Sequence, residues 1–101
     1  MNNLDYNQIS MEIQRIRKLY VLEVIPENSL QHAAYDHGLS VIQCCIDYVN
    51  ESANYTSTQE YTSALGTLSR LIVRYSTRNL NIQYILKVTY KYLELQKRRL
   101  L

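Results

Sequence analysis

The chain is 101 residues long, the size of one domain, which leaves no room for a second hydrophobic core, so we expect a single domain over residues 1–101. Hydrophobic residues make up 47% of the chain and charged residues 20%, and this composition indicates a globular rather than a disordered protein. The formal net charge is only +2, and the two glycines and one proline are too few for the tight turns of an all-β chain, so long helices are favoured.

The first two predicted helices lie on either side of the proline. In residues 4–24 apolar side chains recur at helical spacing, and Pro26 prevents this helix from continuing. In residues 29–51 the same period runs past Gly38, which marks either a kink or a close helix crossing. The expected apolar stripes are Ile9, Ile13, Ile16 and Tyr20 in the first helix, and Leu30, Ala34, Val41, Ile42, Cys45, Ile46 and Val49 in the second.

The last two predicted helices follow the polar loop NESANYTST. In residues 57–78, Ser57 and Glu60 form an expected capping box, and Gly66 lies beside the apolar seam, where it would permit close approach of a neighbour. The polar turn STRNLN separates this helix from one over residues 81–99. The expected stripes are Tyr61, Leu65, Leu68, Ile72 and Tyr75, and then Ile82, Ile85, Leu86, Thr89, Tyr92, Leu93 and Gln96. Four helices with short connections and one apolar stripe each predict an all-α, antiparallel four-helix bundle.

Charge is divided unevenly between the two halves of the chain. Residues 1–60 carry three basic residues against eight acidic ones, a formal charge of −5, whereas residues 61–101 carry eight basic residues against Glu94 alone, a charge of +7. Such an asymmetry indicates a charged partner or a membrane surface, unless the two halves neutralise each other in the fold. The candidate partner-binding residues are Arg70, Arg74, Arg78, Lys87, Lys91, Lys97, Arg98 and Arg99.

Three of these bases form a regular series. Arg70, Arg74 and Arg78 recur every fourth residue, so they would stack on one side of the predicted helix over residues 57–78. Like charges at this spacing destabilise an isolated helix by about 0.2–0.5 kcal/mol per pair. Either an external anionic partner offsets this cost, or acids of the first two helices pair with the arginines inside the fold. The acids available for such pairing include Glu12, Asp47 and Glu51.

No pattern of catalytic or metal-ligating residues is evident. His32 and His37 are five residues apart and point in different directions on a helix, which makes a poor metal site. His32 and Cys45 lie on the same predicted helix roughly 20 Å apart, too far for a nucleophile and its base. The glycines are isolated and form no phosphate-binding loop. We therefore expect a protein that is not an enzyme, with no catalytic residue, metal or cofactor.

The compartment is predicted from the N-terminus and the cysteines. The N-terminal sequence MNNLDYNQIS lacks a basic-apolar signal segment, and the longest apolar runs are only a few residues. Cys44 and Cys45 are neighbours, so a disulfide between them would be strained, and buried free thiols behave as small apolar residues. These features favour an intracellular, cytoplasmic protein.

Residues 39–99 resemble a known protein family. The segments LSVIQCCIDYVNES and YTSALGTLSRLIVRYSTRNLNIQYILKVTYKYLELQKRR are similar to the immunity proteins of pediocin-like (class IIa) bacteriocins, the enterocin A immunity family. The resemblance is strongest at ALGTLSRLI and at the basic turn before the last helix. It implies a cytoplasmic, antiparallel four-helix bundle that protects a bacterium from a pore-forming peptide.

The resemblance also implies a partner and a site. Members of this family associate, at the inner face of the membrane, with the mannose phosphotransferase permease once a bacteriocin has engaged it. Specificity is attributed to the C-terminal half, so the eight bases of residues 61–101 would meet the anionic leaflet or acidic loops of the permease. Two alternatives stay open: a nucleic-acid-binding regulator that uses Arg70, Arg74 and Arg78, and a bundle that dimerises through Tyr84 and Tyr90.

Overall fold

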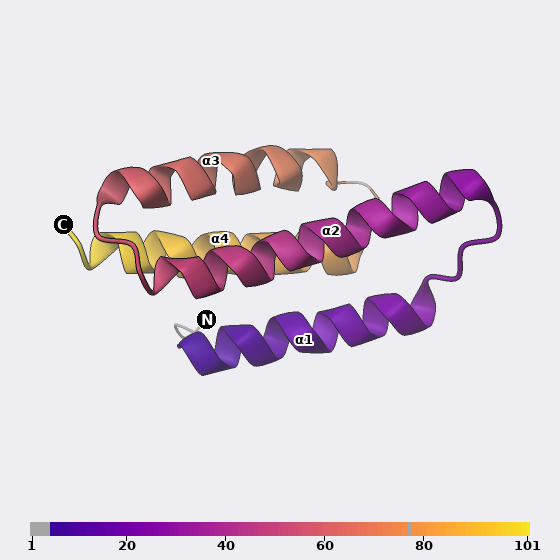
Figure 1. Cartoon of the computed structure of the whole chain (residues 1–101), viewed down its shortest axis with the longest axis horizontal. Helices are drawn as coiled ribbons and strands as arrows, with labels where there is room; N and C mark the ends of the chain where they lie inside the picture. Colours follow the sequence, from indigo (N-terminus) through magenta and orange to yellow (C-terminus); the bar gives the residue numbers. More distant parts are fainter. Residues whose placement is uncertain (1–4, 77) are drawn as a thin grey trace.

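The computed structural model describes residues 5–76 and 78–101. Within these residues the chain forms four helices and no strand: α1 (Tyr6–Glu23), α2 (Ser29–Ser52), α3 (Thr58–Arg74) and α4 (Leu80–Arg98). Consecutive helices run antiparallel in an elongated bundle that measures 47 × 23 × 22 Å between Cα atoms (Figure 1). The predicted all-α four-helix architecture is confirmed.

Polar side chains at the helix starts explain where the helices begin. Asp5 accepts a hydrogen bond from the Gln8 backbone N–H at 2.8 Å, and the Gln8 side chain accepts one from the Asp5 N–H at 2.9 Å, which forms a capping box at α1. Asn28 and Asn79 cap α2 and α4 through their side-chain oxygens. These contacts satisfy N–H groups that have no partner within the helix. Residue 4, where the first helix was expected to begin, lies outside the described residues.

The predicted capping box of α3 is present. The Glu60 carboxylate accepts hydrogen bonds from the backbone N–H groups of Thr56 at 3.1 Å and Ser57 at 3.2 Å. These hydrogen bonds stabilise the ionised carboxylate and lower the pKa of Glu60. The box fixes the first turn of the helix that carries Arg70 and Arg74.

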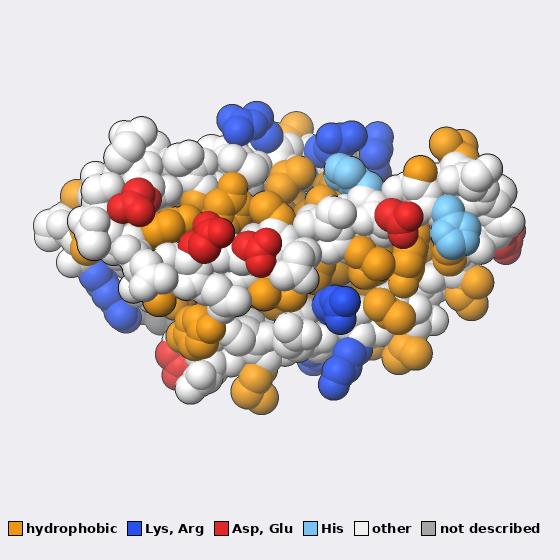
Figure 2. Space-filling view, in the orientation of Figure 1, with side chains coloured by type: hydrophobic (Ala, Val, Ile, Leu, Met, Phe, Trp, Pro, Cys, Tyr) orange, Lys and Arg blue, Asp and Glu red, His pale blue; other side chains and the backbone are white. Residues whose placement is uncertain are grey.

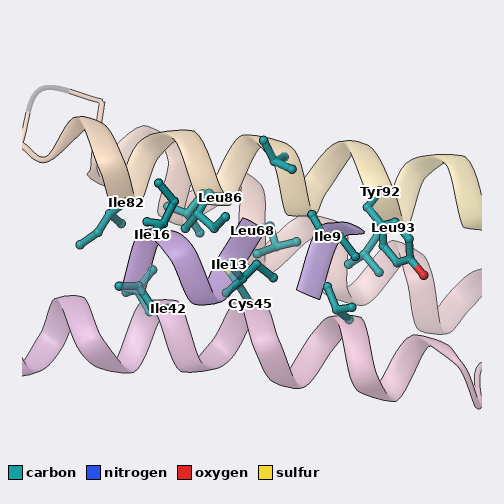
Figure 3. Packing of buried hydrophobic residues seen from close by; sticks show 14 of the residues in the cluster. Ile9, Ile13, Ile16, Ile42, Cys45, Leu68, Ile82, Leu86, Tyr92 and Leu93 are labelled. Carbon is teal, nitrogen blue, oxygen red and sulfur yellow. The ribbon is translucent and has the colours of Figure 1, made fainter. Parts of the chain in front are cut away.

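The core is built on a diagonal contact between α2 and α4. These two helices pack against each other, and α4 also contacts α1 and α3, whereas α1 and α3 do not contact each other. Side chains from the inward faces meet along the bundle axis (Figure 3). The side chains that are fully enclosed include Ile9, Ile13, Ile16, Ile42, Cys45, Leu68, Ile82, Leu86 and Leu93.

The first turns of α2 differ from the predicted apolar stripe. Leu30 and Ala34 were expected to face the core, but both are exposed, and 82% of Leu30 is accessible to solvent. The reason is that α2 extends beyond the ends of α3 and α4, so these turns have no helix to pack against (Figure 1). The first buried residue of α2 is Gly38.

Gly38 marks a close helix crossing, one of the two outcomes expected from the sequence. A Cβ atom at this position would lie 2.7 Å from Cζ of Tyr20 and 2.9 Å from Cδ1 of Ile82. The Tyr20 ring cannot easily move away, because its hydroxyl donates a hydrogen bond to the Tyr35 carbonyl at 3.1 Å. Glycine therefore lets α1 and α4 approach α2 at this level.

The expectation for Gly66 is wrong. The nearest atom to a Cβ built at Gly66 is Nη1 of Arg70 at 3.9 Å, so no neighbouring helix uses the space that this glycine leaves. Gly66 lies beside the buried face of α3 but does not form a close contact.

The two glycines should respond to alanine in opposite directions. Gly38→Ala should lower the free energy of unfolding by about 1–3 kcal/mol, because the steric conflict exceeds the helix-propensity gain of about 1 kcal/mol. Gly66→Ala should raise the free energy of unfolding by about 0.4–1 kcal/mol, because the propensity gain is unopposed. Urea unfolding followed by circular dichroism measures both changes. Equal stabilisation by both substitutions would contradict the close crossing at Gly38.

Candidate basic interaction surface

Arg70 and Arg74 lie on the outer side of α3. Burial fixes the orientation of this helix, because its inward face is enclosed by the other helices. That inward face consists of Tyr61, Ala64, Leu65 and Leu68. Both arginines are exposed and lie one turn apart on the opposite side. The Arg70 guanidinium also donates a hydrogen bond to the Thr67 hydroxyl at 3.3 Å.

Arg78 does not continue this series, which corrects the predicted helix over residues 57–78. The helix ends at Arg74, and Tyr75 leaves the helical conformation with φ −99° and ψ 11°. Tyr75 is held inward: its ring is buried and stacks on the His37 ring of α2 at 5.8 Å, and its hydroxyl bonds to Nδ1 of His37. Arg78 follows in the connection to α4, and residue 77 lies outside the described residues.

On α4 the bases lie along one outward stripe and at the C-terminal end. Lys87, Lys91 and Arg98 point away from the core, Lys97 is half-buried, and Arg99 follows the helix end. Positive charge in the last turn also interacts favourably with the helix dipole. The charge at the end of α4 therefore has a local structural role besides any contact with a partner.

Three ion pairs are found in the described part of the chain, and each lies within one helix. Lys91 and Arg98 approach Glu94 at 3.6 Å and 3.8 Å, and Arg15 pairs with Glu12. The side chains of these pairs are partly or largely exposed, so each pair contributes only about 0–1 kcal/mol. None of the pairs joins the acidic half of the chain to the basic half.

The acids that could have neutralised the arginines make other contacts. Glu12 is held by Arg15 of its own helix, and this hydrogen bond lowers the pKa of Glu12. Asp47 accepts from the Gln43 amide at 3.0 Å, and Glu51 accepts from the Tyr55 hydroxyl at 3.5 Å. Internal pairing of the arginines with these acids is therefore absent over residues 5–76 and 78–101.

The diagonal packing of α2 and α4 explains why the opposite charges do not meet. Because each helix turns its apolar face toward the other, their polar faces point in opposite directions. The exposed acids opposite the buried face of α2 are Asp36, Asp47 and Glu51. The bases opposite the buried face of α4 are Lys87, Lys91 and Arg98. Figure 2 shows acidic side chains over α2 and basic side chains along the edge formed by α3.

The eight candidate residues do not form one compact patch. Arg78 precedes α4 and Arg99 follows it, and the helix between them is roughly 27 Å long at 1.5 Å per residue. Charges this far apart are screened from each other at physiological ionic strength, where the Debye length is about 8 Å. The exposed bases that the helices themselves position form two groups, Arg70 and Arg74 on α3 and Lys87, Lys91 and Arg98 on α4, and we call the two groups together the basic surface.

The cysteines and histidines show no arrangement of ligands or nucleophiles. Cys44 and Cys45 are free thiols, and burial raises the pKa of Cys45 to about 12, which keeps its thiol protonated at neutral pH. In the described part of the chain, no group of three or more His, Cys, Asp or Glu side chains could hold a metal ion. The sequence analysis missed the contact of His37 with Tyr75, because the two residues are far apart in the chain.

Tyr84 and Tyr90 were candidate contacts for a dimer. Tyr84 is 42% exposed, whereas Tyr90 is only partly exposed and packs against the core. The two side chains therefore do not form a matched exposed pair.

The sequence analysis also missed a hollow at the end of the bundle, between the α1–α2 connection and α2. The signal for it was the apolar segment around Pro26, which does not belong to either predicted stripe.

No protein-family model, no curated protein and no solved structure matches this chain, so a function has to be argued from its residues and their geometry. None of the described helices combines the length and the mean hydropathy that crossing a membrane requires.

Removing a base from the surface should leave the fold intact. Arg74→Gln should change the free energy of unfolding by no more than about 0.5 kcal/mol in either direction, because it breaks no ion pair, and the repulsion with Arg70 that it removes is offset by the loss of a favourable charge in the last turn of α3. Arg98→Gln is the matched control and should lower the free energy of unfolding by up to about 0.5 kcal/mol through loss of its contact with Glu94. Urea unfolding measures both values. A loss above about 1 kcal/mol for Arg74→Gln would show that Arg74 is paired in the fold.

Proposed function

We propose that this chain is a non-catalytic binding protein that gives immunity to a class IIa bacteriocin. In this proposal it is cytoplasmic, and it associates at the inner face of the membrane with the mannose phosphotransferase permease that a bacteriocin has engaged. The resemblance of residues 39–99 to bacteriocin immunity proteins supports the partner, and the antiparallel four-helix bundle agrees with the fold which that resemblance implies.

One observation carries the proposal: the basic surface is left without carboxylate partners from the first hairpin. The ion pairs of the described residues are all local, and the acids of α2 point away from α4. Arg70, Arg74 and Lys87 make no ion pair in the described part of the chain, and Glu94 offsets only one of the two charges of Lys91 and Arg98, so a net positive charge is available to an acidic partner. A surface neutralised from within the bundle would have no such attraction.

A comparison of two free energies favours an anionic surface as the partner that offsets the repulsion between the arginines. Near the anionic cytoplasmic leaflet each Lys or Arg gains about 1 kcal/mol. The repulsion between Arg70 and Arg74 costs only about 0.2–0.5 kcal/mol. The basic surface would thus hold the bundle against the membrane, where acidic loops of a membrane protein are also accessible.

Nucleic-acid binding through the arginine series is the weaker alternative. Two arginines, Arg70 and Arg74, remain on the helix, and Arg78 leaves the series. The acidic face of α2 would also oppose wrapping of a polyanion around the bundle.

Protection of a sensitive bacterial strain tests the proposal. Cells that express the chain should survive at least one of a panel of class IIa peptides, and the variant Arg70→Glu/Arg74→Glu/Lys87→Glu/Lys91→Glu should lose most of this protection. Arg15→Glu/Arg17→Glu/Lys18→Glu is the control: it changes charge on the first hairpin and should retain protection. Circular dichroism of each variant confirms that the bundle is folded.

Two results would contradict the proposal at different points. A failure of the wild-type chain to protect against any peptide would reject the immunity function. Equal loss of protection in both variants would retain immunity but reject the basic surface as the working site. Co-purification of the permease with the wild-type chain, with and without bacteriocin, then tests whether the association depends on the bacteriocin.

A further inference from the structure

The N-terminal turns of α2 form an overhang at one end of the bundle. Residues 29–34 are helical, yet every one of them is exposed. The helix projects beyond α3 and α4 at this end (Figure 1). A helical segment without a buried face gains no packing energy from its own fold, so this segment offers an unoccupied surface.

A hollow of about 500 Å³ lies under the overhang. Its walls come from the last turn of α1, the α1–α2 connection, the first turns of α2 and the turn after α3. The apolar part of the lining is formed by Tyr20, Val24, Ile25, Pro26, Ala34, Tyr35 and Tyr75. The volume is within the range of about 300–1,000 Å³ found for small-ligand sites, and it is large enough for a bulky side chain.

The floor of the hollow is held in place by aromatic contacts. Tyr20 and Tyr35 stack with ring centroids 5.2 Å apart, and the Tyr20 hydroxyl donates to the Tyr35 carbonyl at 3.1 Å. Tyr75 stacks on His37 and is hydrogen-bonded to it. Because the floor is fixed by these contacts, the hollow is preformed and a ligand would not have to open it.

The wall of the hollow includes an exposed aliphatic side chain. Ile25, on the α1–α2 connection, lines the hollow and is 77% exposed. Leu30, in the first turn of α2 and next to the lining residue Gln31, is 82% exposed. Exposed apolar side chains of this size at a hollow offer contact area to a protein partner.

Charge identifies the kind of partner. The carboxylates of Glu23 and Glu27 line the same hollow, and neither is in an ion pair within the described residues. Glu23 accepts only a long hydrogen bond, 3.4 Å, from the Asn81 amide. Arg78 lines the turn side of the hollow, so the two walls carry opposite charge with an excess of negative charge.

We infer that this hollow binds a peptide segment of another protein in which a bulky apolar side chain is next to a lysine or arginine. The apolar side chain fills the space between Ile25, Ala34 and Tyr35, and the cation faces Glu23 and Glu27. An anionic lipid surface fits less well, because these carboxylates would oppose its phosphates. The inference does not depend on the proposed function, since it uses none of the residues of the basic surface.

Two synthetic peptides test the inference directly. Acetylated and amidated Lys-Phe-Lys should shift the amide NMR signals of Val24, Ile25 and Ala34 in the full chain, and Glu-Phe-Glu should shift them much less. No shift with Lys-Phe-Lys, shifts elsewhere in the bundle, or equal shifts with both peptides would overturn the inference.

Matched variants locate the binding. Ala34→Trp should abolish the shifts because the indole fills the hollow, whereas Ala33→Trp, on the same exposed turn but outside the lining, should not. Glu23→Gln/Glu27→Gln should weaken Lys-Phe-Lys binding by about two- to fivefold per carboxylate. Asp47→Asn/Glu51→Gln removes the same charge elsewhere and should have little effect. If Ala34→Trp does not fold, the carboxylate pair and its control still decide the question.

Other occupants of the hollow would give distinct results. Perturbation of the same amide signals by phosphatidylglycerol vesicles, with no response to Lys-Phe-Lys, would assign the surface to lipid instead. Concentration-dependent dimerisation in light scattering that Ala34→Trp abolishes would assign it to a second copy of the chain. Either result would reject the cationic peptide as the ligand.

Discussion

The packing of α2 against α4 across the diagonal of the bundle is the constraint on which the rest of the structure depends. The two helices are in contact, while α1 and α3 are kept apart on either side of them. Gly38 makes the approach possible where α2 meets Tyr20 and Ile82, because a side chain there would collide with both. Each of the two central helices therefore buries one face against the other and exposes the opposite face. The distribution of charge on the surface follows from this arrangement.

Since α2 carries acids and α4 carries bases on their outward faces, the fold separates the charges of the chain. The acids of α2 are directed away from the bases of α4, and the ion pairs of the described residues are confined to single helices. The structure thus has a basic surface on the second hairpin and a hollow with an excess of carboxylates at the α1–α2 end. Two surfaces of opposite charge suit two different partners, and we propose a permease at the membrane for the basic surface and a cationic peptide segment for the hollow.

Local sequence patterns predicted the helices and the side that each one buries, because apolar spacing and capping residues act over one or two turns. They failed where the outcome depends on distant residues. The end of α3 follows from the contact between Tyr75 and His37, which no pattern near Tyr75 reveals. Leu30 fits the helical period of α2 but remains exposed, because the other helices end before they reach it. Gly38 and Gly66 look alike in the sequence and differ only in what lies opposite them. For the same reason, the bases could be identified from the sequence, but the absence of ion pairs between them and the acids of the first hairpin could not.

A double-mutant cycle between the acidic face of α2 and the arginines of α3 tests the central claim most directly. The acid variant is Asp47→Asn/Glu51→Gln, the base variant is Arg70→Gln/Arg74→Gln, and urea unfolding gives the free energy of each variant and of their combination. If the two surfaces are independent, the changes should add to within about 0.3–0.5 kcal/mol. A coupling energy above about 1 kcal/mol would mean that acids of the first hairpin already neutralise the arginines, and the basic surface would then not be available to a partner.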